Sequence, residues 1–286
     1  MSRAYRPGSA QAAVHKKAKS RGRHSFLWYF FRVLLVFGLA VLGVACFFHF
    51  KAGRLRGRCA DIVSGLPEEP GPSDNSDAVD ELREEFSNPD VIGVLEIPEL
   101  GYYYPVCQAQ DNEYYLYHDA YGNWDYNGTI FLDASCSGDF SDQTNVLYGH
   151  NMAWGVMFGW MGPHYLQSSQ GITGRGFRLH LEDGTLEYSI LCATTPESYD
   201  EQVYLLDAGE TMEDFYQKLS DRAELWNGDV AHDGNSRTLS LMTCYGTGVY
   251  YRFGVTGIEN APGLSGFRKA QEPDAADSAA AEETGN

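Results

Sequence analysis

The stretch TLSLMTCYG, residues 238–246, is an alternating apolar pattern that ends in a cysteine. A cysteine at the end of a strand is most often a small buried hydrophobic residue, but it can also form a disulfide, bind a metal or act as a nucleophile. A nucleophilic Cys244 requires a nearby base and a group that stabilises an oxyanion. The sequence offers one candidate for each of these two roles.

The candidate base is His150 in NVLYGHNM. It follows a short apolar run, and its neighbours Gly149 and Asn151 are turn formers, so this histidine is expected to project from the rim of a sheet. The other histidines are weaker candidates. His180, for example, lies among polar positions of a predicted hairpin strand and is expected to face solvent.

The candidate oxyanion group is Arg252 in YYRFGV. In an alternating strand it lies on the face opposite Phe253 and Val255. The segment follows Cys244 at the distance of a strand–turn–strand hairpin, which would return Arg252 beside Cys244 on the adjacent strand. A guanidinium stays charged near neutral pH and offers a fork of donors. The alternative is an arginine that is simply solvated on an exposed strand face.

The elements around these residues are mostly short strands separated by Gly, Asn and Asp, from about residue 91 onward. FRLHL-EDG-TLEYSIL predicts a hairpin. TMEDFYQKL predicts a helix, with Thr211 as N-cap and Asp214 three residues later, and SDAVDELREEF predicts another. Seven or eight strands with one inserted helix indicate a mainly β fold, a barrel or a sandwich, and not a βαβ fold.

Charge and hydropathy divide the chain into five parts. Residues 1–25 read as a basic cytoplasmic tail, 26–50 as a transmembrane helix and 51–85 as a linker with a short helix. Residues 86–268 form the domain that holds the candidate catalytic residues, and 269–286 read as an acidic disordered tail. The long basic leader and the absence of a small-x-small cleavage site argue against a cleaved signal peptide. More basic residues precede the apolar segment than follow it closely. We therefore expect a single-pass protein of the cell membrane, with its N-terminus inside and its catalytic domain outside.

The net charge of −18 is unevenly spread, because residues 1–58 contain 12 Lys and Arg and no acidic residue. The acidic remainder argues against nucleic acid as a partner. Of the six cysteines, Cys46 lies in the apolar segment and five lie beyond it, without CxxC or zinc-type spacing. The sequence predicts no metal site and no cofactor, and it leaves the disulfide state open.

Two motifs carry a family resemblance. Residues 145–158, which begin NVLYGHNM, closely resemble the histidine motif of the sortases, specifically class B. SLMTC, residues 240–244, resembles their TLxTC motif, and Arg252 follows at a spacing that class B accommodates. The upstream stretches NPDVIGVLEIPELGYYYPV and DNEYYLYHDAYGNWDYNGTIFLD also resemble class B. The resemblance covers roughly residues 86–258.

The resemblance implies a closed β-barrel and a membrane-anchored cysteine transpeptidase of a Gram-positive cell surface. Such an enzyme cuts a C-terminal sorting signal after a Thr, through a thioester, and joins that Thr to an amine. The resemblance implies that Cys244 is the nucleophile, His150 the general acid/base and Arg252 the clamp on the oxyanion or the substrate. The implied partners are surface proteins that carry sorting signals, and an amine acceptor such as the cell-wall precursor lipid II or a pilin Lys.

Further positions are candidates for substrate binding. Asn112 and Leu116 match class B substrate-contact sites, although barrel packing would also explain them. Thr243 is placed to hydrogen-bond the substrate. Met242 and Tyr245 depart from the usual motif and are expected to reshape the pocket. The last such position is Tyr204, whose alignment with the class B groove is loose.

Three alternatives remain at this point. The enzyme could polymerise pilins by using a pilin Lys as acceptor, and the sequence does not separate this from wall anchoring. A non-catalytic barrel could bind surface proteins, although the joint presence of Cys244, His150 and Arg252 argues against it. A papain-like hydrolase would place its cysteine early and its histidine downstream, the reverse of the order found here.

Overall fold

The computed structural model describes residues 26–152, 155–196, 203–245 and 251–260. The chain divides into two units, Met1–Phe47 and Phe48–Asn286, and the helix α1 (Phe26–Val63) contributes to both. Among the described residues, α1 is the one helix that is long and apolar enough to cross a membrane. Its last turns correct the linker predicted from residue 51, because they are helical, and Leu55, Cys59 and Ile62 pack within the second unit, to which they belong.

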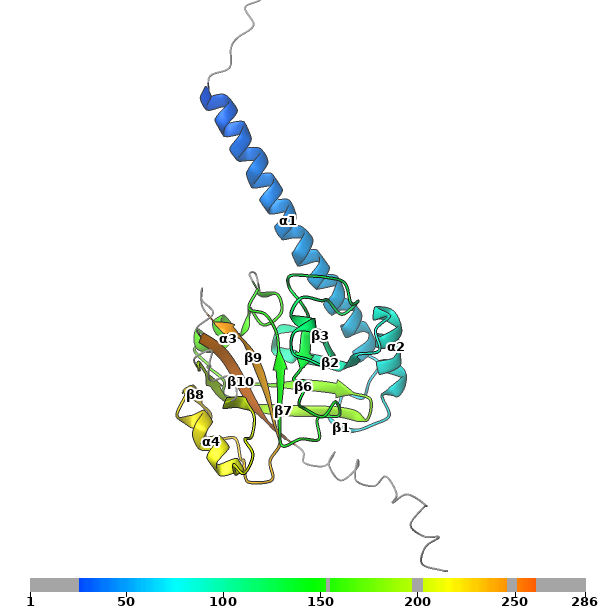
Figure 1. Cartoon of the computed structure of the whole chain (residues 1–286), viewed down its shortest axis with the longest axis vertical. Helices are drawn as coiled ribbons and strands as arrows, with labels where there is room; N and C mark the ends of the chain where they lie inside the picture. Colours follow the sequence, from blue (N-terminus) through cyan, green and yellow to red (C-terminus); the bar gives the residue numbers. More distant parts are fainter. Residues whose placement is uncertain (1–25, 153–154, 197–202, 246–250, 261–286) are drawn as a thin grey trace, which may run out of the picture. The chain divides into compact units, whose positions relative to one another are not determined.

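The second unit is built on a closed barrel of eight strands, with the order β7-β10-β9-β5-β4-β3-β2-β6 and a β6–β7 pairing that closes the ring (Figure 1). This confirms the predicted barrel and excludes the sandwich. The strands are β2 (Val91–Ile97), β3 (Tyr102–Cys107), β4 (Ile130–Leu132), β5 (Thr144–Tyr148), β6 (Gly176–Leu181), β7 (Gly184–Thr194), β9 (Thr238–Tyr245) and β10 (Tyr251–Glu259). Outside the ring, β1 (Gly71–Pro72) and β8 (Ala223–Trp226) pair with β7.

The remaining elements are helices. Besides α1 they are α2 (Ser76–Phe86), α3 (Met161–Leu166), α4 (Met212–Ser220) and the short 3-10 helices η1 (Pro98–Leu100) and η2 (Tyr114–Leu116). The predicted helix at α2 is confirmed, and its buried side chains are Val79, Leu82 and Phe86. Because α2 and α4 lie over different sides of the barrel (Figure 1), each outer face has its own small hydrophobic core.

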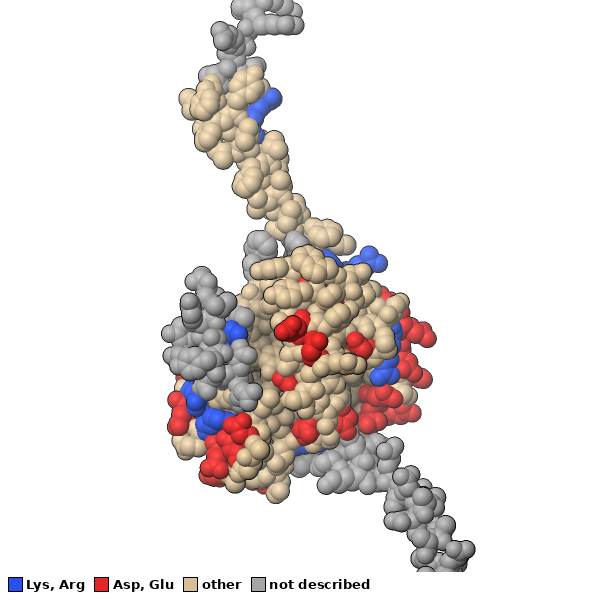
Figure 2. Space-filling model, in the orientation of Figure 1, with Lys and Arg blue, Asp and Glu red and all other residues tan. Residues whose placement is uncertain are grey.

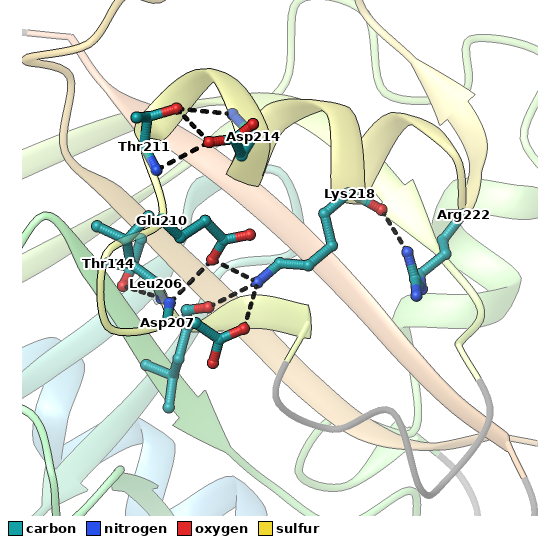
Figure 3. Close-up of polar contacts among 9 residues, drawn as sticks. Thr144, Leu206, Asp207, Glu210, Thr211, Asp214, Lys218 and Arg222 are labelled. Atoms are coloured by element: carbon teal, nitrogen blue, oxygen red, sulfur yellow. Dashed lines mark hydrogen bonds and ion pairs between the residues drawn. The ribbon is translucent and has the colours of Figure 1, made fainter.

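The start of α4 is fixed by polar contacts. Thr211 and Asp214 form the predicted capping box, in which each side chain accepts from the backbone N–H of the other residue. Lys218 lies one turn further along the helix and donates to the Leu205 carbonyl at 3.0 Å and to Glu210 Oε2 at 2.8 Å (Figure 3). These bonds hold the segment before α4 against the helix.

His180 corrects an expectation, because its side chain is buried rather than solvated. Its Nε2 lies 2.8 Å from Glu96 Oε2, and its Nδ1 lies 3.0 Å from Thr185 Oγ1. The alternation of the hairpin was read correctly, but the β2–β6 pairing covers the polar face of this strand with Glu96. Sequence periodicity does not reveal such cross-strand cover.

Acidic side chains gather over α2 and over α4 on the face shown in Figure 2. This agrees with the concentration of Asp and Glu beyond residue 58. Most of these carboxylates are solvated or paired with nearby basic groups, as in Arg58–Glu85 at 2.8 Å. These acidic residues therefore lie at the surface, and the interior of the barrel is lined by apolar side chains.

Candidate active site

The positions of His150 and Cys244 follow from one strand pairing. β5 and β9 are adjacent and parallel, and Tyr148 on β5 is paired with Met242 on β9. His150 and Cys244 each stand two residues beyond that pair. Since parallel strands in register end at the same edge of a sheet, the two residues come together at one rim of the barrel.

Arg252 joins them from the other neighbour of β9. In the antiparallel β9–β10 pair, Arg252 stands directly opposite Cys244. The Arg252 backbone N–H donates to the Pro196 carbonyl at 2.9 Å, on the side away from β9. The Cys244–Arg252 position is therefore of the non-hydrogen-bonded kind, in which the two backbones approach most closely.

A pocket of about 160 Å³ opens at this rim. It contains six of the nine residues that the sequence singled out. Its lining residues are Asn112, Leu116, Phe131, Tyr148, Gly149, His150, Met242, Thr243 and Arg252. The side chains of Cys244 and Tyr245 lie outside the described part of the structure, whereas their backbone belongs to β9.

The His150 ring is oriented by a backbone carbonyl. Its Nε2 lies 2.8 Å from the Leu116 carbonyl oxygen. Because a carbonyl only accepts, Nε2 must carry a hydrogen, which assigns the Nε2–H tautomer to the neutral ring. The rings of Tyr117 and Tyr126 lie 6.1 and 6.4 Å from the His150 ring, centroid to centroid. Nδ1 is therefore the nitrogen left to exchange a proton.

Gly149 allows close packing directly before His150. A Cβ at this position would come within 2.7 Å of the Phe158 ring, which is fully buried. The Phe158 N–H in turn donates to the His150 carbonyl at 3.0 Å. The sequence suggested a glycine that turns the chain, but the structure shows one that makes room for the ring under the histidine.

Sequence reasoning missed a buried carboxylate behind the pocket. Asp133, at the end of β4, accepts from Asn112 Nδ2 at 2.9 Å and from the Tyr148 hydroxyl at 2.7 Å. Burial alone would raise the pKa of Asp133, but the hydrogen bonds from Ser135, Tyr148 and Asn112 outweigh it and hold the pKa below its ordinary value. Asp133 thus connects two lining residues from different elements. Its position after a strand, in FLDAS, was the available signal.

The side chain of Asn112 is largely occupied by this network. Its Oδ1 accepts from the Ala134 N–H at 2.8 Å, while its Nδ2 donates to Asp133. The structure therefore gives Asn112 a role in shaping the pocket wall. Thr243 differs, because its hydroxyl is buried at the pocket and has no hydrogen-bond partner among the described residues. A buried hydroxyl of this kind is suited to a bound molecule.

Tyr204 is not part of this pocket. Its ring is fully buried on the outer face of the barrel, and its hydroxyl lies 2.7 Å from Thr194 Oγ1. It packs with the α4 cluster. The structure thus separates Tyr204 from the other substrate-binding candidates.

The other described cysteines are free thiols. Burial raises the pKa of Cys136 to about 11 and the pKa of Cys192 to about 12, and it also raises the pKa of Cys107. Such groups stay protonated near neutral pH and are poor nucleophiles. They are therefore weak competitors of Cys244 for a catalytic role.

Comparisons with known proteins agree with this architecture. No family model matches the chain. Sortase B of Listeria monocytogenes serovar 1/2a is 30% identical over 174 residues, which cover 59% of this chain and 69% of that protein. The structure of a Staphylococcus aureus sortase B-substrate complex matches with a TM-score of 0.62 at 19% identity, over 73% of this chain and 94% of that one.

A Streptococcus pyogenes class B sortase involved in pilus biogenesis also matches, with a TM-score of 0.55 at 22% identity, over 63% of this chain and 97% of that one. At these identities the two solved structures support a shared fold and nothing further. The eight-stranded barrel is the sortase fold. The chain belongs to the class B sortase family and is a sortase cysteine transpeptidase.

Proposed function

We propose that residues 26–50 anchor this sortase in a cell membrane and that Cys244 transfers surface proteins to an amine of a cell-wall precursor. The observation that carries the proposal is the register of β5 and β9, which brings His150 and Cys244 to one rim beside a pocket. The anchor is supported by the length and apolar composition of α1. On this proposal the N-terminus is inside and the barrel is outside.

The first half of the reaction forms a thioester. The Cys244 thiolate attacks the carbonyl carbon of the Thr in the sorting signal, and the carbon–nitrogen bond of that peptide then breaks. The leaving amine needs a proton. Nδ1 of His150 takes this proton from the Cys244 thiol and passes it to the amine, while Nε2–H stays bonded to the Leu116 carbonyl. The backbone carbonyl thereby keeps the ring in one orientation through the cycle.

The second half reverses these roles. An incoming amine attacks the thioester carbonyl, His150 accepts the proton that the amine loses, and the Cys244 thiolate leaves. In both halves a negative charge develops on the carbonyl oxygen. Arg252, which lines the pocket and is paired with Cys244 in the backbone register, supplies a permanent positive charge for that oxygen.

The remaining pocket residues act on binding. The Thr243 hydroxyl, which has no partner in the described part of the chain, hydrogen-bonds the acyl donor. Leu116 and Met242 provide apolar walls, and the Asp133 network holds Asn112 and Tyr148 in place. Tyr245, which follows Cys244 on β9, stays a candidate for substrate binding. No cofactor takes part in the proposed reaction.

The acyl acceptor separates two forms of the proposal. Wall anchoring uses the amine of a wall precursor such as lipid II, whereas pilus assembly uses a Lys of another pilin. The pilus role belongs to the Streptococcus pyogenes sortase, and the likeness of that protein to this chain is one of fold alone. We therefore treat the pilin Lys as the second candidate.

The test incubates the full chain, in detergent micelles, with a library of peptides that carry sorting-like motifs and with two amines in competition. One amine is the N-terminus of a short wall-type cross-bridge peptide, and the other is a Lys side chain in a pilin-type peptide. Mass spectrometry identifies the cleaved donor, the thioester and the product. Cys244→Ala is the matched control.

We expect cleavage after Thr, a thioester on Cys244 and preferential transfer to the wall-type amine. Transfer mainly to the Lys side chain would establish the pilin form. Turnover that persists in Cys244→Ala would remove the proposed nucleophile.

A further inference from the structure

An aromatic surface segment lies beside the end of the apolar part of α1. Six large hydrophobic side chains beyond residue 50 are exposed in the described part of the chain, and five of them lie between residues 114 and 126. They are Tyr114, Tyr117, Tyr121, Trp124 and Tyr126. Trp124 is 72% exposed and Tyr126 is 64% exposed. Isolated exposed aromatics need no explanation, but such a concentration marks an interaction surface.

The aromatic segment, residues 114–126, is held rigidly. The Asp119 carboxylate accepts from the backbone N–H groups of Tyr121 and Asn123, and Asp125 accepts from the N–H of Asn127. The aromatic side chains are thus displayed from an ordered loop. In a flexible loop, the same aromatic side chains could fold back and bury their rings against the protein.

Lys51 ties this segment to α1. Its Nζ forms ion pairs with the Asp119 and Asp125 carboxylates, which are both buried. These are the two acidic residues of the segment, and Lys51 neutralises both. The aromatic segment is therefore free of exposed acidic charge, although acidic side chains crowd the surface over α2 and α4 (Figure 2).

The position of Lys51 in α1 sets the depth of the segment. Residues 26–50 span about 37 Å as a helix, slightly more than the roughly 30 Å hydrocarbon core of a bilayer. Lys51 directly follows Phe50, so it lies at the headgroup layer if residues 26–50 cross the membrane. Its two carboxylate partners bring the aromatic segment to the same level.

We propose that the aromatic segment rests in the headgroup layer of the bilayer that α1 crosses. Tyr and Trp prefer this layer, because their rings are apolar and their hydroxyl or N–H groups are polar. The inference rests on the membrane anchor of the proposed function and adds a second point of contact to it.

The contact also orients the active site. The rings of Tyr117 and Tyr126 lie against the His150 ring, so the pocket rim is continuous with the aromatic segment. Docking this segment holds the pocket next to the membrane surface, where a membrane-bound donor or a lipid-linked acceptor arrives. A peptide-binding role for the same aromatics is the alternative that the experiment must separate.

The experiment uses the full chain reconstituted in phosphatidylcholine vesicles, with and without lipids brominated near the headgroup end of the acyl chains. Bromine quenches tryptophan at short range. Trp124→Phe removes the reporter of the aromatic segment. Trp226→Phe removes the other tryptophan that is exposed among the described residues, on β8. Trp28, Trp154 and Trp160 are present in both variants, so the difference between the native chain and Trp124→Phe isolates Trp124.

We expect a quenched component that is lost in Trp124→Phe and retained in Trp226→Phe. Lack of quenching of Trp124 in a chain that resists alkaline extraction would overturn the docking and leave the anchor intact. Extraction of the chain by alkali would instead refute the anchor itself. If a sorting-signal peptide shields the fluorescence of Trp124 from a soluble quencher while brominated lipid does not quench it, the segment binds peptide and the inference is wrong. None of these readouts requires turnover.

Discussion

Cys244 on β9 and Arg252 on β10 stand at directly opposite positions, and the backbone N–H of Arg252 points away from Cys244, to the Pro196 carbonyl. This pairing is independent of the loop between the strands, because it is fixed by the ladder that continues to Thr238 and Ile258. The backbone pairing of Arg252 with Cys244 is thus a property of the barrel. It gives the first prediction.

Arg252→Ala should lower kcat/KM by about 10²- to 10³-fold, because a charge that stabilises the developing oxyanion is lost. Arg252→Lys should recover only part of the loss, since a lysine keeps the charge but not the fork of donors. Arg178→Ala on β6 is the matched control, because Arg178 pairs with Glu187 away from the pocket. Equal rates for Arg252→Ala and the native chain would exclude Arg252 from the mechanism.

The tautomer of His150 is a second prediction. The contact between Nε2 and the Leu116 carbonyl requires Nε2–H, whereas Nδ1 of His118 and Nδ1 of His232 contact backbone carbonyls and require Nδ1–H. Nitrogen NMR of histidine-labelled protein at alkaline pH should therefore show opposite tautomers for His150 and the other two. An Nδ1–H form of His150 would contradict the proposed proton route.

Removal of the Thr243 hydroxyl should affect substrate binding but not the stability of the fold. Because it is buried without a described partner, Thr243→Val should leave the free energy of unfolding unchanged or slightly higher. If the hydroxyl bonds the acyl donor, kcat/KM should fall by roughly tenfold. Thr256→Val should lower the free energy of unfolding and leave kcat/KM unchanged, because the Thr256 hydroxyl hydrogen-bonds the Ser240 hydroxyl at 2.8 Å inside the sheet. Full activity in Thr243→Val would show that the hydroxyl does not touch substrate.

Asp133 predicts a pH dependence of stability. Its folded-state pKa is lowered, so the carboxylate stabilises the fold above its ordinary pKa of 3.8, and this contribution is lost as the pH falls through the lowered value. Asp133→Asn should cost about 1–3 kcal/mol at neutral pH and should flatten the acid limb of the stability curve. Urea titrations at several pH values measure this.

Asp229→Asn, at an exposed loop position, is the control for Asp133 and should change neither the stability nor its pH dependence. An unchanged acid limb in Asp133→Asn would show that the network does not depend on the charge.

The close contact between Gly254 and Tyr204 predicts that a larger residue at position 254 destabilises the fold. A Cβ there would overlap the hydroxyl of the buried Tyr204, so Gly254→Ala should destabilise the fold by about 1–3 kcal/mol. Gly228→Ala, where a Cβ meets open space, should be near neutral. Combining Gly254→Ala with Tyr204→Leu should cost less than the sum of the single changes, because the overlap is then relieved. Strict additivity in thermal unfolding would refute the contact.

The site could be predicted to different degrees. His150 and Cys244 were found because each ends an apolar run in a recognisable motif, and Arg252 because hairpin spacing is local. Asp133 and Tyr148 were missed, because their hydrogen bond joins the residue after β4 to β5, and no local pattern shows that these two segments lie side by side. Tyr204 was misplaced, because a tyrosine that reaches a groove and a tyrosine that packs under a helix look alike in one dimension.

By itself, the sequence determined what depends on local pattern. It specified the alternation of the strands, the capping box of α4, the apolar length of α1 and the chemistry of the cysteine, histidine and arginine. Only the tertiary structure decided what depends on pairing between distant segments. The parallel register of β5 and β9, the burial of His180 against Glu96 and the ion pairs from Lys51 to the aromatic segment all join residues far apart in the chain. Periodicity describes which face a residue occupies, whereas only the closed barrel determines what lies against that face.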